Sequence, residues 1–236
     1  MKFVRVKTYE EMSTLAADLM AAQILVKPDS VIGLATGSTP VGMYKKLSEY
    51  NKAGRIDFSK VKSFNLDEYA GLDVSNEQSY RYFMNDKLFN HINIDMANTH
   101  VPNGCAPDLA AEGKHYDEMI KAAGGIDMQL LGIGFDGHIG FNEPDDHFTA
   151  ETHGVVLDES TIDANSRFFE KREDVPTMAI SMGMMSIMQA KKILFVANGK
   201  GKEDIVNKAF FGPITPEVPA SILQLHPDVT VFFSEE

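Results

Sequence analysis

The chain is poor in cysteine and in positive charge, and each shortage excludes certain classes of binding site or partner. Cys105 is the only cysteine among 236 residues, which excludes an intramolecular disulfide and a cluster of thiolate metal ligands. There are 22 Lys and Arg residues against 34 Asp and Glu residues, for a net charge of -12. This balance gives no electrostatic footprint for nucleic acid or for an anionic membrane. Such a chain binds a phosphate group through a few local cations and backbone N–H groups.

Long apolar runs are also absent. No stretch approaches the length of a membrane span, and residues 1–7 contain no secretory apolar core. We therefore expect a cytoplasmic protein with neither a membrane partner nor a nucleic-acid partner.

The chain does contain the alternation that is typical of an α/β fold. Short β-rich runs alternate with segments of helical period, which predicts an open, mostly parallel, twisted sheet with helices on both faces, a Rossmann-like three-layer sandwich. The expected strands are Lys2–Val6, Val31–Ala35, Val61–Leu66, Met128–Gly132, Thr177–Ser181, Ile193–Ala197 and Thr230–Phe233. The expected helices are Thr8–Leu25, Val41–Tyr50, Tyr80–Asn90, Leu109–Ala122 and Lys202–Phe211.

These elements predict a single domain over residues 1–236. Its length and its 44% of hydrophobic residues are enough for one substantial core. Residues 143–176 form the least regular section, so we expect an excursion or lid there. In open sheets of this kind, ligands bind beyond the carboxyl ends of the strands, where the strand order reverses.

The first polar loop is ATGSTP (residues 35–40), between an expected strand and the helix expected from Val41. Its glycine permits a tight turn, its hydroxyls are donors, and the helix N-terminus adds free N–H groups, so the loop suits a phosphate. An equally good interpretation is an ordinary N-cap, with Ser38 or Thr39 bonding the first turn and Pro40 beginning the helix. The Gly-Lys-Ser/Thr ending of a nucleotide P-loop is missing.

The second polar segment is FNLDEY (residues 64–69), where an expected strand runs out into acidic residues. A carboxylate at this end of a strand reaches a ligand over the sheet edge and can act as a base on a carbon acid, which makes Asp67 the candidate. The alternative is that Asp67 and Glu68 are a capping or solvated pair, and these residues taken alone favour it.

The third segment is GIGFDGHIGFNEP (residues 132–144), whose first six residues match the dinucleotide-binding pattern G-x-G-x-x-G. That pattern must feed a helix, and the further breakers Gly140 and Pro144 make a long helix improbable here. What remains is a glycine-rich loop with Asp136, His138 and Glu143. An imidazole flanked by carboxylates suits proton transfer on a substrate oxygen. The alternative for a lone histidine is a structural role.

Two cationic residues later in the chain are candidates for binding a phosphate group. Arg167 offers a bidentate fork, and Lys202 lies at an expected strand-to-helix turn, although each of these residue types is more often a surface charge. Lys200 and Lys208 are rivals of Lys202 that the sequence does not separate from it.

Other conspicuous residues are assigned no chemistry. We interpret Cys105 and His226 as structural and the methionine-rich residues 182–188 as flexible core filler. The His, Cys and carboxylate residues show no convincing metal spacing, so no metal site is expected.

Taken together and in this order, the segments ATGSTP, FNLDEY, GIGFDGHIGFNEP, NSRFF and GKGK resemble the glucosamine-6-phosphate deaminase family over almost the whole chain. The resemblance implies an open α/β sheet and an enzyme of amino-sugar catabolism without a redox cofactor or catalytic metal. The implied reaction is an aldose-ketose isomerisation coupled to deamination, in which glucosamine 6-phosphate and water give fructose 6-phosphate and ammonia. We class such an enzyme as a hydrolase.

The resemblance also implies residue roles. His138 would open the pyranose ring as general acid/base, tuned by Asp136 and Glu143, and Asp67 would move the C2 proton to C1. Glu68 would support Asp67 from behind. The phosphate would be bound by the residues Thr36, Gly37, Ser38, Thr39, Arg167 and Lys202.

One departure concerns regulation. Longer, hexameric members bind an N-acetylated sugar phosphate effector through basic residues shortly after FNEP, whereas residues 145–155 here contain neither Arg nor Lys. The extended tail of those members is also missing after Glu236. We therefore expect an unregulated monomer without an allosteric effector.

Two other functions compete with this reading. A 6-phosphogluconolactonase of similar fold is the enzymatic alternative, but a lactonase has no carbon acid to deprotonate and so gives Asp67 no task. A sugar-phosphate sensor is the non-catalytic alternative, but residues 1–30 show no basic DNA-recognition element.

Overall fold

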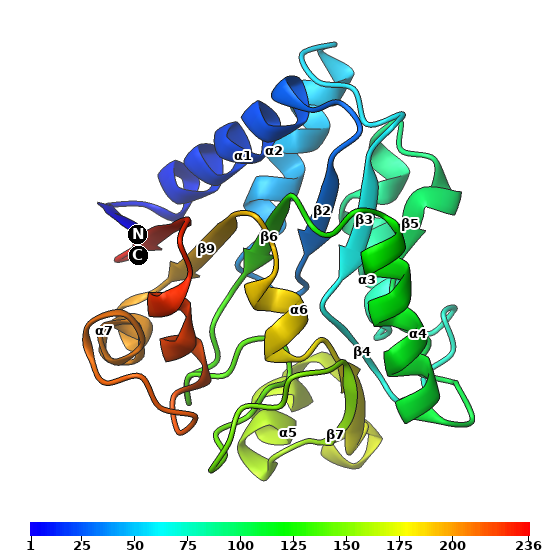
Figure 1. Cartoon of the computed structure of the whole chain (residues 1–236), viewed down its shortest axis with the longest axis vertical. Coiled ribbons are helices and arrows are strands. Elements are labelled where there is room, and N and C mark those ends of the chain that lie inside the picture. Colours follow the sequence, from blue (N-terminus) through cyan, green and yellow to red (C-terminus); the bar gives the residue numbers. More distant parts are fainter.

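A computed structural model describes residues 1–236, the side chains of residues 160, 164 and 168 excepted. Seven parallel strands form the main sheet, in the order β1-β10-β9-β6-β2-β3-β5. These strands are β1 Lys2–Val6, β2 Val31–Leu34, β3 Lys62–Asn65, β5 Thr99–His100, β6 Met128–Leu131, β9 Ile193–Asn198 and β10 Val229–Ser234. Because β1 pairs with β10, the two termini lie side by side (Figure 1).

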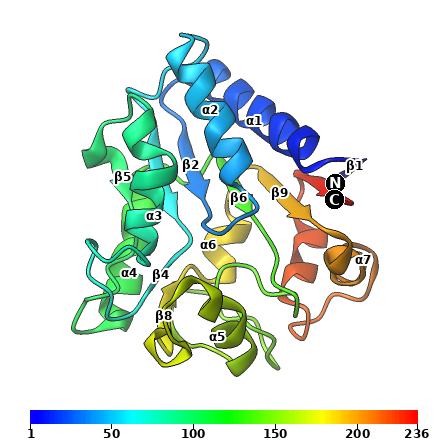
Figure 2. The ribbon, with the colours of Figure 1, turned by 180° about the vertical axis from the view of Figure 1, so that it is seen from behind.

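Helices cover both faces of this sheet, which confirms the predicted fold class. The α-helices are α1 Tyr9–Val26, α2 Val41–Lys52, α3 Tyr80–Lys87, α4 Leu109–Ala122, α5 Glu159–Asn165, α6 Met184–Met188 and α7 Glu203–Phe211. The short 3-10 helices are η1 Phe89–His91, η2 Met96–Asn98, η3 Ser166–Phe168, η4 Arg172–Asp174, η5 Lys200–Lys202 and η6 Pro219–Leu225. α1, α2 and α3 lie in front of the sheet in Figure 2, whereas α4 and α6 lie in front of it in Figure 1.

Local sequence signals explain where the helices begin and end. The side chain of Thr8 caps α1 by accepting from the backbone of Glu11, and Asp108 caps α4 in the same way. The turn after α4 contains Gly124 and Gly125 at φ +92° and +76°, a conformation that favours glycine, so the expected stop is confirmed. α3 ends at Lys87 rather than at the expected Asn90, because the backbone leaves the helical region at Leu88, where φ is -138°.

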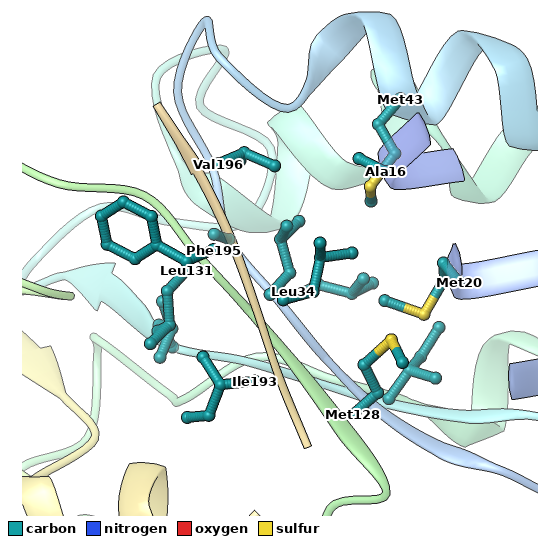
Figure 3. Close-up of a cluster of buried hydrophobic side chains, with 14 of the residues drawn as sticks. Ala16, Met20, Leu34, Met43, Met128, Leu131, Ile193, Phe195 and Val196 are labelled. Atoms are coloured by element: carbon teal, nitrogen blue, oxygen red, sulfur yellow. The ribbon is translucent and has the colours of Figure 1, made fainter. Parts of the chain in front are cut away.

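The core fills the space on both sides of the sheet. Figure 3 shows Leu34, Met128 and Val196 pointing toward α1 and α2, while Phe195 and Leu131 point the other way. On that second side Phe195 meets Phe210 of α7 edge to face, with ring centroids 4.8 Å apart. Buried apolar residues on both faces of every central strand are the mark of a three-layer α/β sheet.

The strand order reverses between β2 and β6. From β2 the sheet grows through β3 to β5, and from β6 it grows in the opposite direction through β9 to β10. The loops that follow β2 and β6 therefore diverge and leave a crevice at their carboxyl ends, which is where open α/β sheets bind ligands.

One expected strand belongs to a different sheet. We expected Thr177–Ser181 in the mostly parallel sheet, but β8 (Met178–Ser181) is the middle strand of a second, antiparallel sheet, between β4 (Asp67–Tyr69) and β7 (His153–Val156). The expectation was wrong because a four-residue apolar run looks the same in either sheet, and its partner is decided by tertiary packing. The sequence analysis also missed the short strands β4, β5 and β7.

The second sheet and α5 form an apolar cluster of their own, beyond the carboxyl ends of β2 and β3. The arrowheads of these two strands point toward it in Figure 1. The cluster consists of Tyr69, Phe141, Leu157, Ile162, Val175 and Ala179. Residues 143–176, the least regular stretch of the sequence, contain β7, α5, η3 and η4.

Candidate active site

A cavity of about 590 Å³ lies at the crevice between the loops after β2 and β6. Its walls come from residues 35–40 after β2, Asp67 after β3, residues 132–141 after β6, and Asn198 and Lys202 at the end of β9 and beyond. Thr161, Asn165 and Arg167 close it from the side of the small sheet. The cavity therefore collects residues from separate parts of the chain, and it lies where the sequence predicts that a ligand binds.

His138 lines this cavity, and two carboxylates face one nitrogen of its ring. Its Nδ1 is 2.7 Å from Oδ1 of Asp136 and 3.3 Å from Oε2 of Glu143. The same Oδ1 accepts from the backbone N–H of His138 at 3.1 Å, so Asp136 holds both the ring and its backbone. Because Nδ1 faces the carboxylates, Nε2 is the ring nitrogen left for a ligand.

The opposite charges of His138 and Asp136 stabilise each other's ionised form. Burial lowers the pKa of His138, but Asp136 and Glu143 outweigh burial and raise that pKa to about 9. Burial raises the pKa of Asp136, but its contacts with His138 hold that pKa well below its ordinary value. At neutral pH the site therefore contains an imidazolium beside an ionised Asp136, ready to donate a proton.

The trio also has to be tested as a metal site. One ligand atom from each of Asp136, His138 and Glu143 lies within 4.8 Å of the others. Two ligand atoms of a tetrahedral zinc ion, each about 2.0–2.2 Å from the metal, lie roughly 3.4 Å apart. Nδ1 of His138 and Oδ1 of Asp136 are closer than that, at 2.7 Å, which is a hydrogen-bond distance. The arrangement fits an ion pair between a protonated His138 and Asp136 better than a metal ion.

Close packing in the glycine-rich loop holds His138 in place. A Cβ on Gly134 would lie 2.2 Å from the imidazole ring, so only glycine fits there. Gly137 and Gly140 adopt φ +100° and +60°, which turn the chain back toward the cavity. Over the stretch that the structure describes, no helix follows Gly137 until α5, so the loop is not a dinucleotide-binding turn, as the sequence predicted.

Asp67 lies at the start of β4, directly beyond the carboxyl end of β3, with 6% of its surface exposed. The pKa of Asp67 is raised to about 7. Burial is the main cause; the charge of Glu68 adds to the rise, and the charge of His138 opposes it. A carboxylate with a pKa near neutrality is ionised for much of the time and still binds a proton well, as a general base requires. Asp67 therefore has the burial, the position and the pKa of such a base.

Glu68 does not share the cavity with its neighbour. Its carboxylate accepts three backbone N–H groups, from Tyr69 and Tyr80 at Oε1 and from Arg81 at Oε2, over 2.8–3.0 Å. Tyr80 and Arg81 begin α3, so Glu68 ties the N-terminus of that helix to β4. The alternative of a solvated pair is therefore wrong for both residues, which are buried, but its other form, a capping carboxylate, is correct for Glu68.

The loop at residues 35–40 keeps its hydroxyls free of the helix it precedes. α2 begins after Pro40 with no side-chain cap, so the alternative that Ser38 or Thr39 caps the helix is wrong. The hydroxyl of Tyr9 accepts from Gly42 N–H instead and donates to this loop, while Thr39 donates to Asn198 at 2.7 Å. Thr36, Gly37, Ser38 and Thr39 all line the cavity.

Two cations lie at the cavity, as predicted. Arg167 and Lys202 both line it, whereas the rival Lys200 and Lys208 are exposed and do not. Lys202 donates from Nζ to the backbone oxygen of Ile133 at 2.6 Å and lies over the ring of Phe135 at 3.7 Å. The pKa of Lys202 is lowered to about 8. Burial is the main cause of this lowering; the charge of Asp136 opposes it and the charge of Arg167 adds to it.

Sequence reasoning missed several residues of the cavity. Asn198 is the last residue of the apolar strand β9. A polar residue at the end of a strand is the same signal that pointed to Asp67, so Asn198 could have been found in this way. Phe135 and Asn165 also line the cavity and lie in the segments GIGFDGHIGFNEP and NSRFF, but nothing in those segments singled out these two side chains. Tyr80 and Thr161 line it as well, and they lie in stretches without a distinctive pattern.

Of the residues that were assigned no chemistry, His226 is confirmed as structural, whereas Met185, at 42% exposed, is not core filler. His226 is buried between the backbone oxygen of Ala190 and the backbone N–H of Asp228. In residues 182–188, Met182 and Met184 are in the core. Cys105 is exposed, with its sulfur against the backbone oxygen of Leu72.

Comparison with known proteins agrees with this geometry. Among the described residues, no helix combines the length and apolar character needed to span a membrane. A relative from Lachnoclostridium phytofermentans named glucosamine-6-phosphate deaminase is 61% identical over 98% of both chains. A solved structure described as a monomeric glucosamine-6-phosphate deaminase superposes with a TM-score of 0.97 at 44% identity, covering 99% of this chain and 97% of that one.

A more distant structure shares the fold only. The 6-phosphogluconolactonase of Thermotoga maritima superposes with a TM-score of 0.77 at 18% identity, covering 100% of this chain and 99% of that one. A sequence model of one family, described as glucosamine-6-phosphate isomerases/6-phosphogluconolactonase, matches residues 6–232. This match spans nearly the whole chain and includes every segment that lines the cavity. The chain therefore belongs to the glucosamine-6-phosphate isomerase/6-phosphogluconolactonase family.

Proposed function

We propose that the protein is a glucosamine-6-phosphate deaminase, which converts glucosamine 6-phosphate and water into fructose 6-phosphate and ammonia. The observation that carries the proposal is that Asp67 and the acid-flanked His138 line one cavity together with Arg167 and Lys202. The reaction needs one group that moves protons on oxygen, another that moves a proton on carbon, and cations for a phosphate. The relatives that cover the whole chain bear the name of this enzyme.

Ring opening is the task of His138. As the C1–O5 bond of the sugar breaks, the ring oxygen gains a proton and the anomeric hydroxyl loses one. An imidazolium gives the first proton and the resulting imidazole takes the second, so one side chain balances the step. The raised pKa of His138, about 9, favours the charged form at the start, and Asp136 and Glu143 keep the ring aligned.

Isomerisation is the task of Asp67. Its carboxylate removes the C2 proton of the open-chain sugar and returns a proton to C1, which moves the double bond through an enolamine to an imine at C2. Water then adds to that carbon and ammonia leaves, which gives the ketone of fructose 6-phosphate. The pKa of about 7 lets Asp67 accept the proton and release it again.

The phosphate of the substrate would be bound by two cations and by the loop after β2, all of which line the cavity. Arg167 and Lys202 supply positive charge, and residues 36–39 supply hydroxyls and backbone N–H groups at the start of α2. None of the loop hydroxyls caps α2, and that of Thr39 donates to Asn198, so Thr36 and Ser38 are the hydroxyls proposed for the phosphate.

We propose four further properties on narrower grounds. Water is consumed, so the deamination is hydrolytic in character. The cavity draws on both sheets, so residues 1–236 act as one domain. The protein is a cytoplasmic monomer, like the monomeric deaminase that it resembles in structure. It needs no redox cofactor, catalytic metal or allosteric effector, because the proton transfers above use side chains alone.

The test is incubation of the protein with glucosamine 6-phosphate in the presence of a chelator, with ammonia and fructose 6-phosphate measured together. Equal amounts of both products are expected. Hydrolysis of 6-phosphogluconolactone without ammonia release from the amino sugar would assign the lactonase activity instead. Binding of the amino sugar without turnover would indicate a sensor.

A further inference from the structure

Thr161 joins α5 to the catalytic trio through one part-buried hydrogen bond. Its hydroxyl donates to Oε1 of Glu143 at 2.7 Å. Thr161 is 4% exposed and the Glu143 side chain is 8% exposed, so water does not compete easily for this contact. The other oxygen of the same carboxylate, Oε2, faces Nδ1 of His138 at 3.3 Å. Oε1 of Glu143 is therefore held by a hydrogen bond, whereas Oε2 lies close to Nδ1 of His138 without one.

The position of Thr161 in the chain adds a second relationship. Thr161 lies on α5, which runs directly into η3 and brings Arg167 to the cavity. Ile162, the next residue, is buried in the apolar cluster of the small sheet and anchors the helix. One short segment therefore carries both the contact to Glu143 and a cation for the phosphate.

We propose that Thr161 is a positioning residue for the deaminase reaction proposed above: it holds Glu143 in the rotamer that faces His138, and it makes that alignment depend on the segment that binds the substrate phosphate. The inference rests on the proposed function, but its geometric part concerns His138 alone. Thr161 acts through Glu143 and takes no part in a proton transfer.

The physical reason lies in the terminal carboxylate of Glu143. A hydroxyl donor stabilises the ionised carboxylate and fixes its rotation, so that Oε2 stays beside Nδ1. Oε2 of Glu143 and Nδ1 of His138 are both shielded from solvent and have no conventional hydrogen bond to other described atoms. Without the hydroxyl, the Glu143 carboxylate is free to rotate away, and His138 then keeps only Asp136 as its close partner.

The Thr161 substitutions leave the other charged groups near this pair chemically unchanged. Asp136 lies on the same loop as His138, and Asp67 and Lys202 line the same cavity. A smaller cavity of about 160 Å³ lies on the far side of Glu143, and its other ionisable residues are Asp145, His147, His153 and Asp158. A change in the titration of His138 on loss of the Thr161 hydroxyl therefore reports on Glu143.

The first experiment follows the His138 ring by NMR in the ligand-free protein. The chain has seven histidines, so the His138→Gln variant serves to assign the signal. In Thr161→Val, which removes the hydroxyl and keeps the shape, we expect the titration midpoint to fall by about one pH unit. Thr161→Ser keeps the donor and should titrate as the wild type does. Ile162→Val, which loosens α5 without touching the hydroxyl, is the matched control.

The second experiment measures turnover of the same variants. Thr161→Val should lower kcat about tenfold with KM changed less than about twofold, because Arg167 stays in place, and Thr161→Ser should restore kcat. An unchanged His138 titration in folded Thr161→Val, or an equal change in Ile162→Val, would overturn the inference. If the wild type releases no ammonia, the proposed function fails, and the titration still shows whether Thr161 orients Glu143.

Discussion

The charge of His138 lowers the pKa of Asp67, and the two side chains line one cavity although they come from different loops. Burial and Glu68 act in the opposite direction, and the balance leaves the pKa of Asp67 at about 7. The two proton-transferring groups are therefore coupled, since the charge on the imidazole helps to keep the carboxylate ionised.

This coupling predicts a pH dependence with a definite sign. Asp67 acts only when ionised, so kcat/KM should rise with pH toward about 7 and fall roughly tenfold for each unit below it. In His138→Gln the favourable charge is gone, and the Asp67 carboxyl, followed by carbon NMR, should titrate at higher pH than in the wild type. A midpoint that stays at its wild-type value in this variant would show that the two groups are not coupled.

Replacing the two groups should stop different steps. Asp67→Asn should abolish solvent exchange at C2 and lower turnover by about 10²–10⁴-fold, yet still accelerate interconversion of the substrate anomers, because His138 remains to open the ring. His138→Gln should lose the acceleration of anomer interconversion. Both rates are measurable by NMR on glucosamine 6-phosphate in deuterated water.

A control and a stability measurement accompany these variants. Asp73 is exposed and accepts hydrogen bonds from Ser75. The substitution Asp73→Asn is therefore a matched control that should leave both rates unchanged. Asp67→Asn should not lower the melting temperature, because it removes a charge whose burial is unfavourable. Undiminished exchange at C2 in Asp67→Asn would remove Asp67 from its proposed role.

Lys202 should govern phosphate affinity in a pH-dependent way. Its pKa is lowered to about 8, so its charge is complete at low pH and is lost as the pH rises through 8. Binding of inorganic phosphate, measured by calorimetry, should weaken over that range, and Lys202→Gln should remove both the affinity and its pH dependence. Lys200→Gln is the control, because Lys200 is exposed and does not line the cavity. Equal losses in both variants would argue against a specific role of Lys202.

N-acetylglucosamine 6-phosphate should not activate the enzyme. Residues after Glu143 line the smaller cavity with Asp145, His147, His153 and Asp158, and among the described residues around it there is neither a lysine nor an arginine. A phosphate ester at neutral pH needs such cations. Substrate curves should be hyperbolic with and without the acetylated sugar phosphate, and a sigmoidal curve that becomes hyperbolic when it is added would refute the expectation.

Much of the candidate site followed from local pattern. Asp67 stood out because it follows an apolar run that ends at the edge of the sheet, and Asp136 with His138 because both lie in one loop rich in glycine. Thr161 had no such signal, since it lies in a polar helix and its partner Glu143 is brought to it only by the packing of α5. Lys202 could not be separated from Lys200 either, because only the turn of η5 decides which side chain points inward.

The amino-acid sequence by itself determined the alternation of strands and helices, the loops that end the strands, and a glycine-rich loop that cannot feed a helix. These are local properties, written in periodicity and in the conformational limits of glycine and proline. The tertiary structure alone decided that β8 joins a second sheet and that Asp67, His138, Thr161, Arg167 and Lys202 meet at one cavity. It also decided the pKa values of Asp67 and His138 on which their proposed roles rest, because burial and the distance to neighbouring charges exist only once distant segments have packed together.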